Sequence, residues 1–359
     1  MPEPLKNLYN KKFINSLASE FKKVHKKFNP EKFSTDVFAD GWRNKELKAR
    51  MRHITLVLNK HLPDDYSQSI KIMKRLKGQF SGFEYMFLPD YVELFGLDSF
   101  ETSVVALEHF TSFASSEFAV RPFIKKFPDK MMRQMYCWAK SENYHVRRLA
   151  SEGCRPRLPW AMALPEFKKN PKPVIKILEK LKSDESEYVR RSVANNLNDI
   201  SRDHPELVAS LAKKWLGQHE HIDGVVKHGC RTLLKNGHRE VLKLFGFAVP
   251  GHIKIKKFTT DRKVRIGQEL LFSFFINTDK SKLGKLRIEY VVDFVRSNNK
   301  SNRKVFKISE GFYSEKEKII EKKHSFRKIT TRKYYPGTHS LALIINGREM
   351  ASKKFQLDG

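Results

Sequence analysis

Residues 144–152 read YHVRRLASE, and a second version of this pattern, EYVRRSVAN, occupies residues 187–195. The two Val-Arg-Arg triplets begin 43 residues apart, at Val146 and Val189, and a fainter third copy, VVKH, occupies residues 225–228. Repeats of about 40 to 47 residues with helical patterning are typical of HEAT-type helical repeats. The pattern therefore predicts a solenoid of stacked helices.

The second copy places apolar and polar side chains on opposite sides of one helix. Val189, Val193 and Leu197 recur every four residues, which predicts a stripe that faces the core. The opposite side carries polar residues at the same spacing, namely Arg191, Asn195 and Asp199.

The first copy has the same organisation, with Arg148 and Glu152 at the equivalent polar positions. Ser141 and Asp184, also 43 residues apart, are residue types that cap helices well. We therefore expect each of them to begin the helix that follows.

The pattern changes sharply after Pro250-Gly251. Residues 1–247 read as helix after helix, whereas residues 270–276 and 286–294 alternate strictly between apolar and other residues, as half-buried strands do. In the second of these, we expect Arg287, Glu289 and Asp293 to point away from the core. Asn346-Gly347 predicts a tight hairpin.

We therefore predict a mainly α chain of two domains. Residues 1–247 form a HEAT-like helical-repeat solenoid, and residues 251–359 form a small all-β sandwich of the immunoglobulin-like type. The second domain contains no cysteine, so any likeness to immunoglobulins lies in its architecture alone. The three cysteines, Cys137, Cys154 and Cys230, are expected to be reduced thiols.

The chain is strongly basic, with 70 lysines and arginines against 40 acids and a formal net charge of +30. Such a field binds phosphate backbones, and a curved helical repeat offers a surface for them. Solubility or an anionic membrane surface is the competing interpretation. The sequence has no apolar run of membrane-spanning length and no signal-peptide core at its start, so we expect a cytoplasmic, nucleoid-associated protein that does not bind membranes.

Acidic residues recur on the predicted DNA-facing side. Glu117 and Glu152 each follow a serine and precede an Arg-Pro pair, and they lie 35 residues apart. Stacked repeats would bring Glu117, Glu152 and Asp199 to one cleft, with neighbouring helices about 10 Å apart. Such acids can stabilise a cationic base or an oxocarbenium-like sugar. The alternative is ion pairing at four-residue spacing, of Glu152 with Arg148 and of Glu117 with Arg121.

Trp160 follows this acidic segment, where its ring is either an aromatic plane for a nucleotide or part of the core. Arg155 and Arg157 are placed to meet phosphates. The other tryptophans, Trp42, Trp138 and Trp215, are interpreted as core residues. The 13 histidines form no metal-binding motif, so neither a metal nor another cofactor is predicted.

Four segments resemble the AlkC branch of the AlkC/AlkD DNA alkylation repair glycosylases. They are residues 42–52 (WRNKELKARMR), 116–123 (SEFAVRPF), 150–160 (ASEGCRPRLPW) and 189–201 (VRRSVANNLNDIS). The resemblance covers about residues 1–250, and the hairpin region after Pro336 resembles the immunoglobulin-like domain of some AlkC proteins.

This resemblance implies a glycosylase that removes cationic N-alkylated bases, 3-methyladenine and 3-methylcytosine, without flipping them. We expect it to act as a monomer on double-stranded DNA. It implies that Glu117, Glu152 and Asp199 are the catalytic acids and that Trp160 presses against the sugar of the damaged nucleotide. Further candidate DNA-binding residues are Arg148, Arg155, Arg157, Arg191 and Asn195. The competing class is a non-catalytic helical-repeat scaffold that only holds nucleic acid.

Overall fold

A computed structural model describes the chain except for residues 1–2, 40, 77–80, 297–300 and 330–331. Its contacts divide it into two units, residues 1–204 with 215–229 and residues 205–214 with 230–359. The last helix ends at Leu244 and the first strand begins at Ile253. The architecture is thus a helical-repeat domain followed by a β-sheet domain, while the limits 1–247 and 251–359 stay predictions.

Sixteen α-helices are present in the described part of the chain. They are α1 (Lys11–Val24), α2 (Pro30–Phe38), α3 (Leu47–His61), α4 (Tyr66–Lys74), α5 (Phe87–Phe95), α6 (Phe100–Phe110), α7 (Val120–Lys126), α8 (Pro128–Trp138), α9 (Tyr144–Glu152), α10 (Pro165–Lys169), α11 (Lys172–Leu181), α12 (Glu187–Ile200), α13 (Pro205–Trp215), α14 (Glu220–Gly229), α15 (Arg231–Lys235) and α16 (Arg239–Leu244). Short 3-10 turns cover Leu5–Leu8 (η1), Trp42–Asn44 (η2) and Phe83–Met86 (η3).

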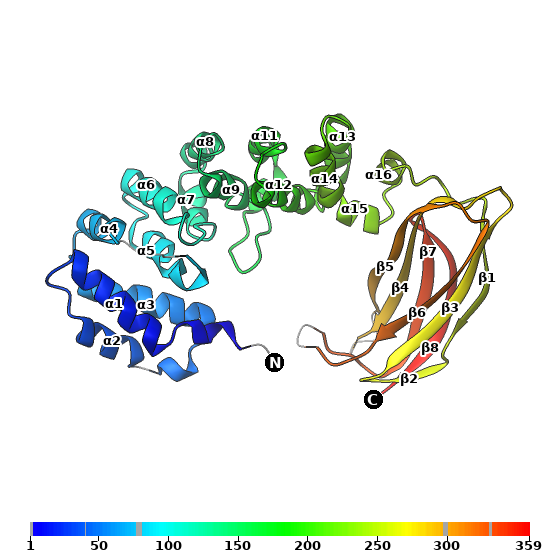
Figure 1. The fold of residues 1–359 in the computed structure, drawn as a ribbon, viewed down its shortest axis with the longest axis horizontal. Helices are drawn as coiled ribbons and strands as arrows, with labels where there is room; N and C mark the ends of the chain where they lie inside the picture. Colours follow the sequence, from blue (N-terminus) through cyan, green and yellow to red (C-terminus); the bar gives the residue numbers. More distant parts are fainter. Residues whose placement is uncertain (1–2, 40, 77–80, 297–300, 330–331) are drawn as a thin grey trace. The chain divides into compact units, whose positions relative to one another are not determined.

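Two layers of helices make up most of the first unit. Helices α6, α8 and α11 form one layer, and α5, α7, α9 and α12 form the other (Figure 1). Helix α12 packs against both α9 and α14. The predicted apolar stripe of α12 is confirmed, because Val189, Val193 and Leu197 are fully buried.

The repeated Val-Arg-Arg motif has the same backbone contacts in both copies. The Arg147 guanidinium donates hydrogen bonds to the carbonyls of Ser141 and Glu142, at 3.0 and 2.8 Å. Arg190, its equivalent, donates to the carbonyls of Asp184 and Glu185, at 2.6 and 2.8 Å. The first arginine of each motif therefore ties its helix to the preceding turn.

The predicted caps were wrong by two residues. The N-caps of α9 and α12 are Asn143 and Ser186. Ser141 and Asp184 instead accept hydrogen bonds from the backbone N–H groups of these two caps, at 3.2 and 2.9 Å. Short polar side chains stabilise such turns as readily as helix ends, so composition alone does not separate the two positions.

The second unit contains eight strands in its described residues: β1 (Ile253–Thr260), β2 (Lys263–Arg265), β3 (Glu269–Thr278), β4 (Gly284–Val295), β5 (Ser301–Tyr313), β6 (Glu317–Ser325), β7 (Gly337–Ile345) and β8 (Arg348–Asp358). One sheet has the order β1-β3-β6 and the other β2-β8-β7-β4-β5. Their facing side chains form one apolar core, which includes Phe274 and Ile320 of the first sheet and Ile288, Leu341 and Phe355 of the second.

The β7–β8 hairpin is confirmed at the predicted position. Ile345 pairs with Arg348 across a two-residue turn. Asn346 and Gly347 both adopt positive φ, 46° and 77°, which the tight hairpin turn requires and which these residue types tolerate. The Asn346 amide also donates to the carbonyl of Ala248, at 2.8 Å.

One strand prediction was wrong in part. Strand β3 alternates as expected, but both sides of the central part of β4 are buried. Arg287 and Glu289 are 7% and 1% exposed and form an ion pair at 2.6 Å, and Arg287 also pairs with Glu310 at 2.6 Å. Charged residues at alternate positions predicted solvent there, whereas mutual pairing lets these side chains be buried.

Candidate active site

An open groove of about 560 Å³ lies on the first unit beside the ends of α6 and α9. Its walls combine aromatic rings with charged groups. The aromatic lining consists of Phe83, Phe113, Phe118, His145, Trp160 and Tyr188. The charged lining consists of Glu117, Arg148, Glu152 and Arg155. The groove therefore brings together residues from segments that lie far apart in the sequence.

Three acids and two arginines alternate beside this groove, and we call these five residues the acid–arginine cluster. Arg148 pairs with Glu117 and also approaches Glu152, at 3.5 Å. Arg155 lies between Glu152 and Asp199, at 2.7 and 2.8 Å. Each guanidinium group thus bridges two carboxylates from different parts of the chain.

The local helices explain how these side chains meet. Glu152 is the last residue of α9, and Gly153 follows it. A Cβ at Gly153 would lie 2.6 Å from a methyl group of Val120, so glycine permits the end of α9 to approach α7 closely. Asp199 lies near the end of α12, which packs against α9.

Two members of the cluster, Asp199 and Arg148, have shifted pKa values. Burial raises the pKa of Asp199, while the hydrogen bond and charge of Arg155 oppose this change. Burial alone would lower the pKa of Arg148, but the charges of Glu117 and Glu152 raise it overall. With all five groups ionised, three negative charges face two positive ones, so the cluster keeps one net negative charge in a strongly basic protein.

Trp160 stands at the groove with 62% of its surface exposed, unlike the other tryptophans. Its indole makes an edge-to-face contact with Phe83, with ring centroids 6.4 Å apart. Trp42, Trp138 and Trp215 are 7%, 2% and 0% exposed, which confirms their interpretation as core residues. An exposed aromatic ring beside carboxylates is available for contact with a nucleotide.

The remaining predicted residues lie in other surroundings. Asp199 is 4% exposed and is connected to the groove through Arg155 rather than lining it. Arg157 pairs with Asp203 at 2.6 Å. Arg191 is exposed and pairs with Glu187 at 2.7 Å, and Asn195 is half-buried on the same helix. None of these four residues is among the described residues that line the groove.

The ion-pairing alternative is correct for one acid and wrong for the other. The four-residue pair between Arg148 and Glu152 is present. Glu117, however, pairs with Arg148 of the next repeat. Arg121 is fully buried and donates to the carbonyls of Met162 and Gly153, at 2.6 and 2.9 Å.

Several groove residues were not singled out by the sequence. Tyr188 covers the Arg148 guanidinium, with 4.7 Å between the guanidinium carbon and the ring centroid. His145 makes an edge-to-face contact with Tyr188, and burial together with the charge of Arg148 lowers its pKa. Both residues fall inside the repeated motif, so an aromatic residue just before each Val-Arg-Arg triplet was the available signal.

Within the described ranges, no three His, Cys, Asp or Glu side chains gather as a metal site would require. Among the described residues, every helix is too short or too polar to serve as a membrane span.

Known families and proteins match both domains. Residues 96–242 match the family described as "DNA alkylation repair enzyme", and residues 254–359 match "Uncharacterised protein YhaZ, C-terminal Ig-like domain". The "Uncharacterized protein YhaZ" of Bacillus subtilis (strain 168) is 44% identical over 355 residues, which cover 98% of this chain and 99% of that protein.

A solved structure also matches along the whole chain. It is the Pseudomonas fluorescens alkylpurine DNA glycosylase AlkC, bound to DNA containing an abasic site analog. It is 34% identical, with a TM-score of 0.92, and the match covers 99% of this chain and 100% of that one.

The fold and these matches define a helical-repeat protein with a C-terminal immunoglobulin-like domain. The chain belongs to the DNA alkylation repair enzyme family, and it resembles AlkC over its full length. The resemblance inferred from the four sequence segments is thereby confirmed.

Proposed function

We propose that this protein is a DNA glycosylase that hydrolyses the N-glycosidic bond of cationic N-alkylated bases, 3-methyladenine and 3-methylcytosine. The observation that carries the proposal is the acid–arginine cluster, which presents Glu117 and Glu152 beside an exposed Trp160 in an open groove. The cluster holds one more carboxylate than it has guanidinium groups, and excess negative charge opposes DNA binding, so we assign these acids a role in chemistry. The HEAT-like repeat is the platform that places them side by side.

The reaction matches what carboxylates can do. Alkylation of a ring nitrogen makes the base cationic, so the C1′–N bond breaks with its electron pair moving to the base and neutralising it. The sugar becomes oxocarbenium-like, and nearby negative charge stabilises it. A water oxygen then bonds to C1′, and its proton passes to a carboxylate or to solvent. The leaving base needs no protonation, so no general acid is required.

The residues take different parts in this proposal. Glu117 and Glu152 face the groove, where they stabilise the sugar and orient the water. Asp199 is held by Arg155, so it acts on the reaction through the position of that guanidinium group. Arg148 and Arg155 fix the carboxylates and line the groove next to DNA. Arg157, Arg191 and Asn195 lie outside it and are proposed to contact the duplex more remotely.

Trp160 is proposed to press against the sugar of the damaged nucleotide without extrusion of the base. Its exposed ring and the open groove support this arrangement, because the indole is reachable from the surface beside the two acids that line the groove. We further propose that a monomer acts on double-stranded DNA in the cytoplasm, at the nucleoid.

The immunoglobulin-like domain is proposed to hold DNA. Residues 251–359 contain 26 lysines and arginines against 11 acids, half of the net positive charge of the chain. A domain that only covered the end of a solenoid would not require this density of charge. Each phosphate contact it makes would add to the salt dependence of binding.

A single-turnover assay tests the function. The full-length protein should release free 3-methyladenine and 3-methylcytosine from alkylated duplex DNA, and it should release no uracil from a uracil-containing duplex. Uracil is uncharged in the nucleotide and would leave as an anion, so negative charge near the sugar is insufficient for its release. Tight binding with no base release would instead support the non-catalytic scaffold, and efficient uracil release would indicate a conventional base pocket.

A further inference from the structure

The backbone at Trp160 is in an unusual conformation. Trp160 has a φ of 64°, in the left-handed region, which is disfavoured for large side chains. Residues of this kind persist when the surroundings hold them, and they cluster at functional sites. The contacts that hold Trp160 therefore determine where its indole stands in the groove.

Two cationic side chains hold the segment of residues 156–164, which we call the Trp160 segment. The Lys48 ammonium donates a hydrogen bond to the carbonyl of Trp160 itself, at 2.7 Å. Arg121 donates to the carbonyl of Met162, at 2.6 Å. The segment is closed by a backbone hydrogen bond from Leu164 to Pro156, at 3.2 Å. Lys48 comes from α3, more than a hundred residues earlier.

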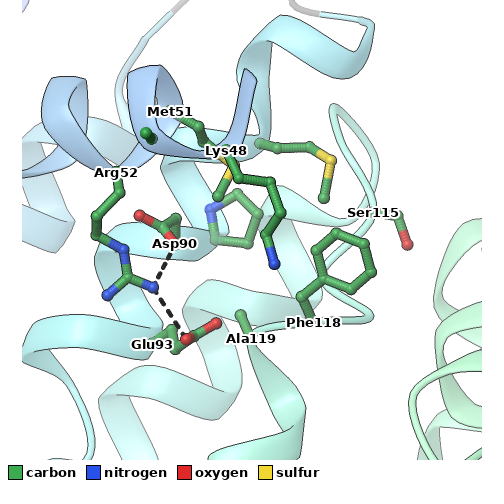
Figure 2. A pocket seen from close by; sticks show the side chains of 11 residues that line it. Lys48, Met51, Arg52, Asp90, Glu93, Ser115, Phe118 and Ala119 are labelled. Carbon is green, nitrogen blue, oxygen red and sulfur yellow. Dashed lines mark hydrogen bonds and ion pairs between the residues drawn. The ribbon is translucent and has the colours of Figure 1, made fainter. Parts of the chain in front are cut away.

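Lys48 reaches Trp160 across a second pocket, of about 260 Å³, that adjoins the groove. The pocket lies between α3, α5 and the segment that contains Phe118, and Figure 2 shows the Lys48 side chain running along it toward the Phe118 ring. The Lys48 ammonium lies 5.4 Å from the centroid of that ring. Phe118 lines both the pocket and the groove.

The charges of this pocket favour an ammonium group at that place. Asp90 and Glu93 both bind Arg52, at 2.8 and 3.0 Å (Figure 2). Two carboxylates and one guanidinium group leave one negative charge uncompensated, and the charge of Lys48 acts on both acids. Lys48 is therefore attracted to the pocket by Asp90 and Glu93, and from there it binds the Trp160 carbonyl.

We propose that Lys48 is a positioning residue, which fixes the left-handed backbone of Trp160 and thereby sets the indole against the damaged nucleotide. The inference rests on the proposed function, since the indole can contact a damaged nucleotide only if the groove binds one. Lys48 is itself exposed, so the competing role is a direct contact with a DNA phosphate. The two roles differ in whether the effect of Lys48 depends on the presence of the indole.

A double-mutant cycle on the full-length protein separates them. Lys48→Met removes the donor but keeps the length of the side chain, and it should lower the single-turnover rate of base release about tenfold to a hundredfold, as misplacement of a catalytic contact does. In a Trp160→Ala background, Lys48→Met should have no further effect. Lys48→Arg, which keeps a donor, should recover most of the rate. The proposal would be overturned if the double variant lost rate by the product of the two single-variant factors. It would also be overturned if Lys48→Met and Lys48→Arg lost the same amount of rate.

A second measurement does not depend on catalysis. Because the other three tryptophans are buried, acrylamide quenching of the free protein reports mainly on Trp160. Lys48→Met should change the quenching constant and Lys48→Arg should not, while both variants keep the wild-type melting temperature. Unchanged quenching in Lys48→Met would contradict the proposal even if the enzyme is active. If Lys48→Met alters the quenching but the wild-type protein releases no base, the positioning contact is supported and the proposed function is refuted.

Discussion

Arg148 and Arg191 occupy equivalent positions in the two Val-Arg-Arg copies, yet their surroundings differ. Arg148 is half-buried between Glu117 and Glu152 at the groove, with Tyr188 over its guanidinium. Arg191 is exposed and has a single four-residue ion pair with Glu187. The repeat therefore supplies the same residue type twice, and only the copy at the groove is incorporated into the acid–arginine cluster.

At the scale of single residues, the raised pKa of Asp199 predicts a pH dependence. As pH falls, Asp199 binds a proton at a higher pH than an ordinary aspartate does, because burial disfavours its charge. Its ion pair with Arg155 then weakens, so single-turnover base release should decline as the solution is acidified, starting at a higher pH than the titration of an ordinary aspartate would give. In Asp199→Asn the rate should be lower at neutral pH, and it should change less as the pH falls. A variant whose profile matches the wild type would show that Asp199 has no part in the reaction.

The site residues were predicted from sequence to different degrees. Glu117, Glu152 and Trp160 were placed correctly at one groove, because repeat spacing brings equivalent positions side by side. The partners of the acids were not all predictable. Glu117 pairs with an arginine 31 residues later, and the choice between Arg121 and Arg148 depends on how the segment between α6 and α7 folds.

At the scale of secondary-structure elements, Arg147 connects α9 to the turn before α12. Its guanidinium binds Asp184 through two hydrogen bonds, at 2.6 and 3.0 Å, and both side chains are largely buried. Removal of one partner of such a pair typically costs about 3 to 5 kcal/mol. Arg147→Gln should therefore lower the free energy of unfolding by a loss of that order, measured by urea denaturation.

Arg191→Gln is the matched control for this prediction. It removes an arginine of the same repeated motif, but from an exposed ion pair with Glu187. Exposed pairs contribute about 0 to 1 kcal/mol, so the variant should unfold close to the wild-type midpoint. Similar losses in Arg147→Gln and Arg191→Gln would show that the Arg147–Asp184 contact does not join the two repeats as described.

Strand β6 carries a second element-scale prediction. His324 is 6% exposed, and burial together with the charge of Arg332 lowers its pKa from 6.5 to about 4. As the pH falls, the unfolded chain therefore binds a proton at His324 near pH 6.5, whereas the folded protein binds it only near pH 4. Stability should be lost as pH falls through this window, by about 3 kcal/mol at 1.36 kcal/mol for each unit.

His324→Gln tests this loss, because glutamine does not titrate and can still accept a hydrogen bond from Tyr290, as His324 can at 3.0 Å. The variant should be less stable than the wild type near neutral pH, but its stability should fall less between pH 6.5 and pH 4. Urea denaturation of the full-length protein, followed by near-ultraviolet circular dichroism at each pH, gives the comparison. Parallel pH dependences would mean that His324 is not the responsible group.

Sequence patterns predicted the elements better than their ends and their surroundings. The core stripe of α12, the alternation of β3 and the Asn346–Gly347 turn follow from local periodicity and backbone preference, and all three are present. Burial of both sides of β4 was not predictable in the same way. It depends on the pairing of Arg287 with Glu289 and Glu310, which joins two strands.

At the scale of the whole molecule, the distribution of charge predicts how DNA binding responds to salt. Exposed lysines lie on both sheets of the second unit, for example Lys304 and Lys307 on β5 and Lys322 and Lys323 on β6. If a sheet contacts phosphates, replacement of its lysine pair by glutamine should weaken binding to undamaged duplex DNA. The salt slope should then decrease by about 0.9 for each lost contact.

A salt titration of the two double variants and the wild type on one duplex makes this measurement. A reduced slope for one pair identifies the sheet that faces DNA. If both pairs leave the slope unchanged, neither of these lysine pairs contacts phosphate, and the positive charge of the domain serves another purpose.

The most direct test of the catalytic role of the groove compares Glu152→Gln with Glu187→Gln in single-turnover release of 3-methyladenine. Glu152 is buried in the acid–arginine cluster, whereas Glu187 is exposed at the start of α12. Glu152→Gln should reduce release about a hundredfold or more, the scale of losing one electrostatic stabiliser, while binding to undamaged DNA stays equal or becomes tighter. Glu187→Gln should retain the wild-type rate. Full release by Glu152→Gln would contradict the assignment of the carboxylates as the groups that stabilise the sugar.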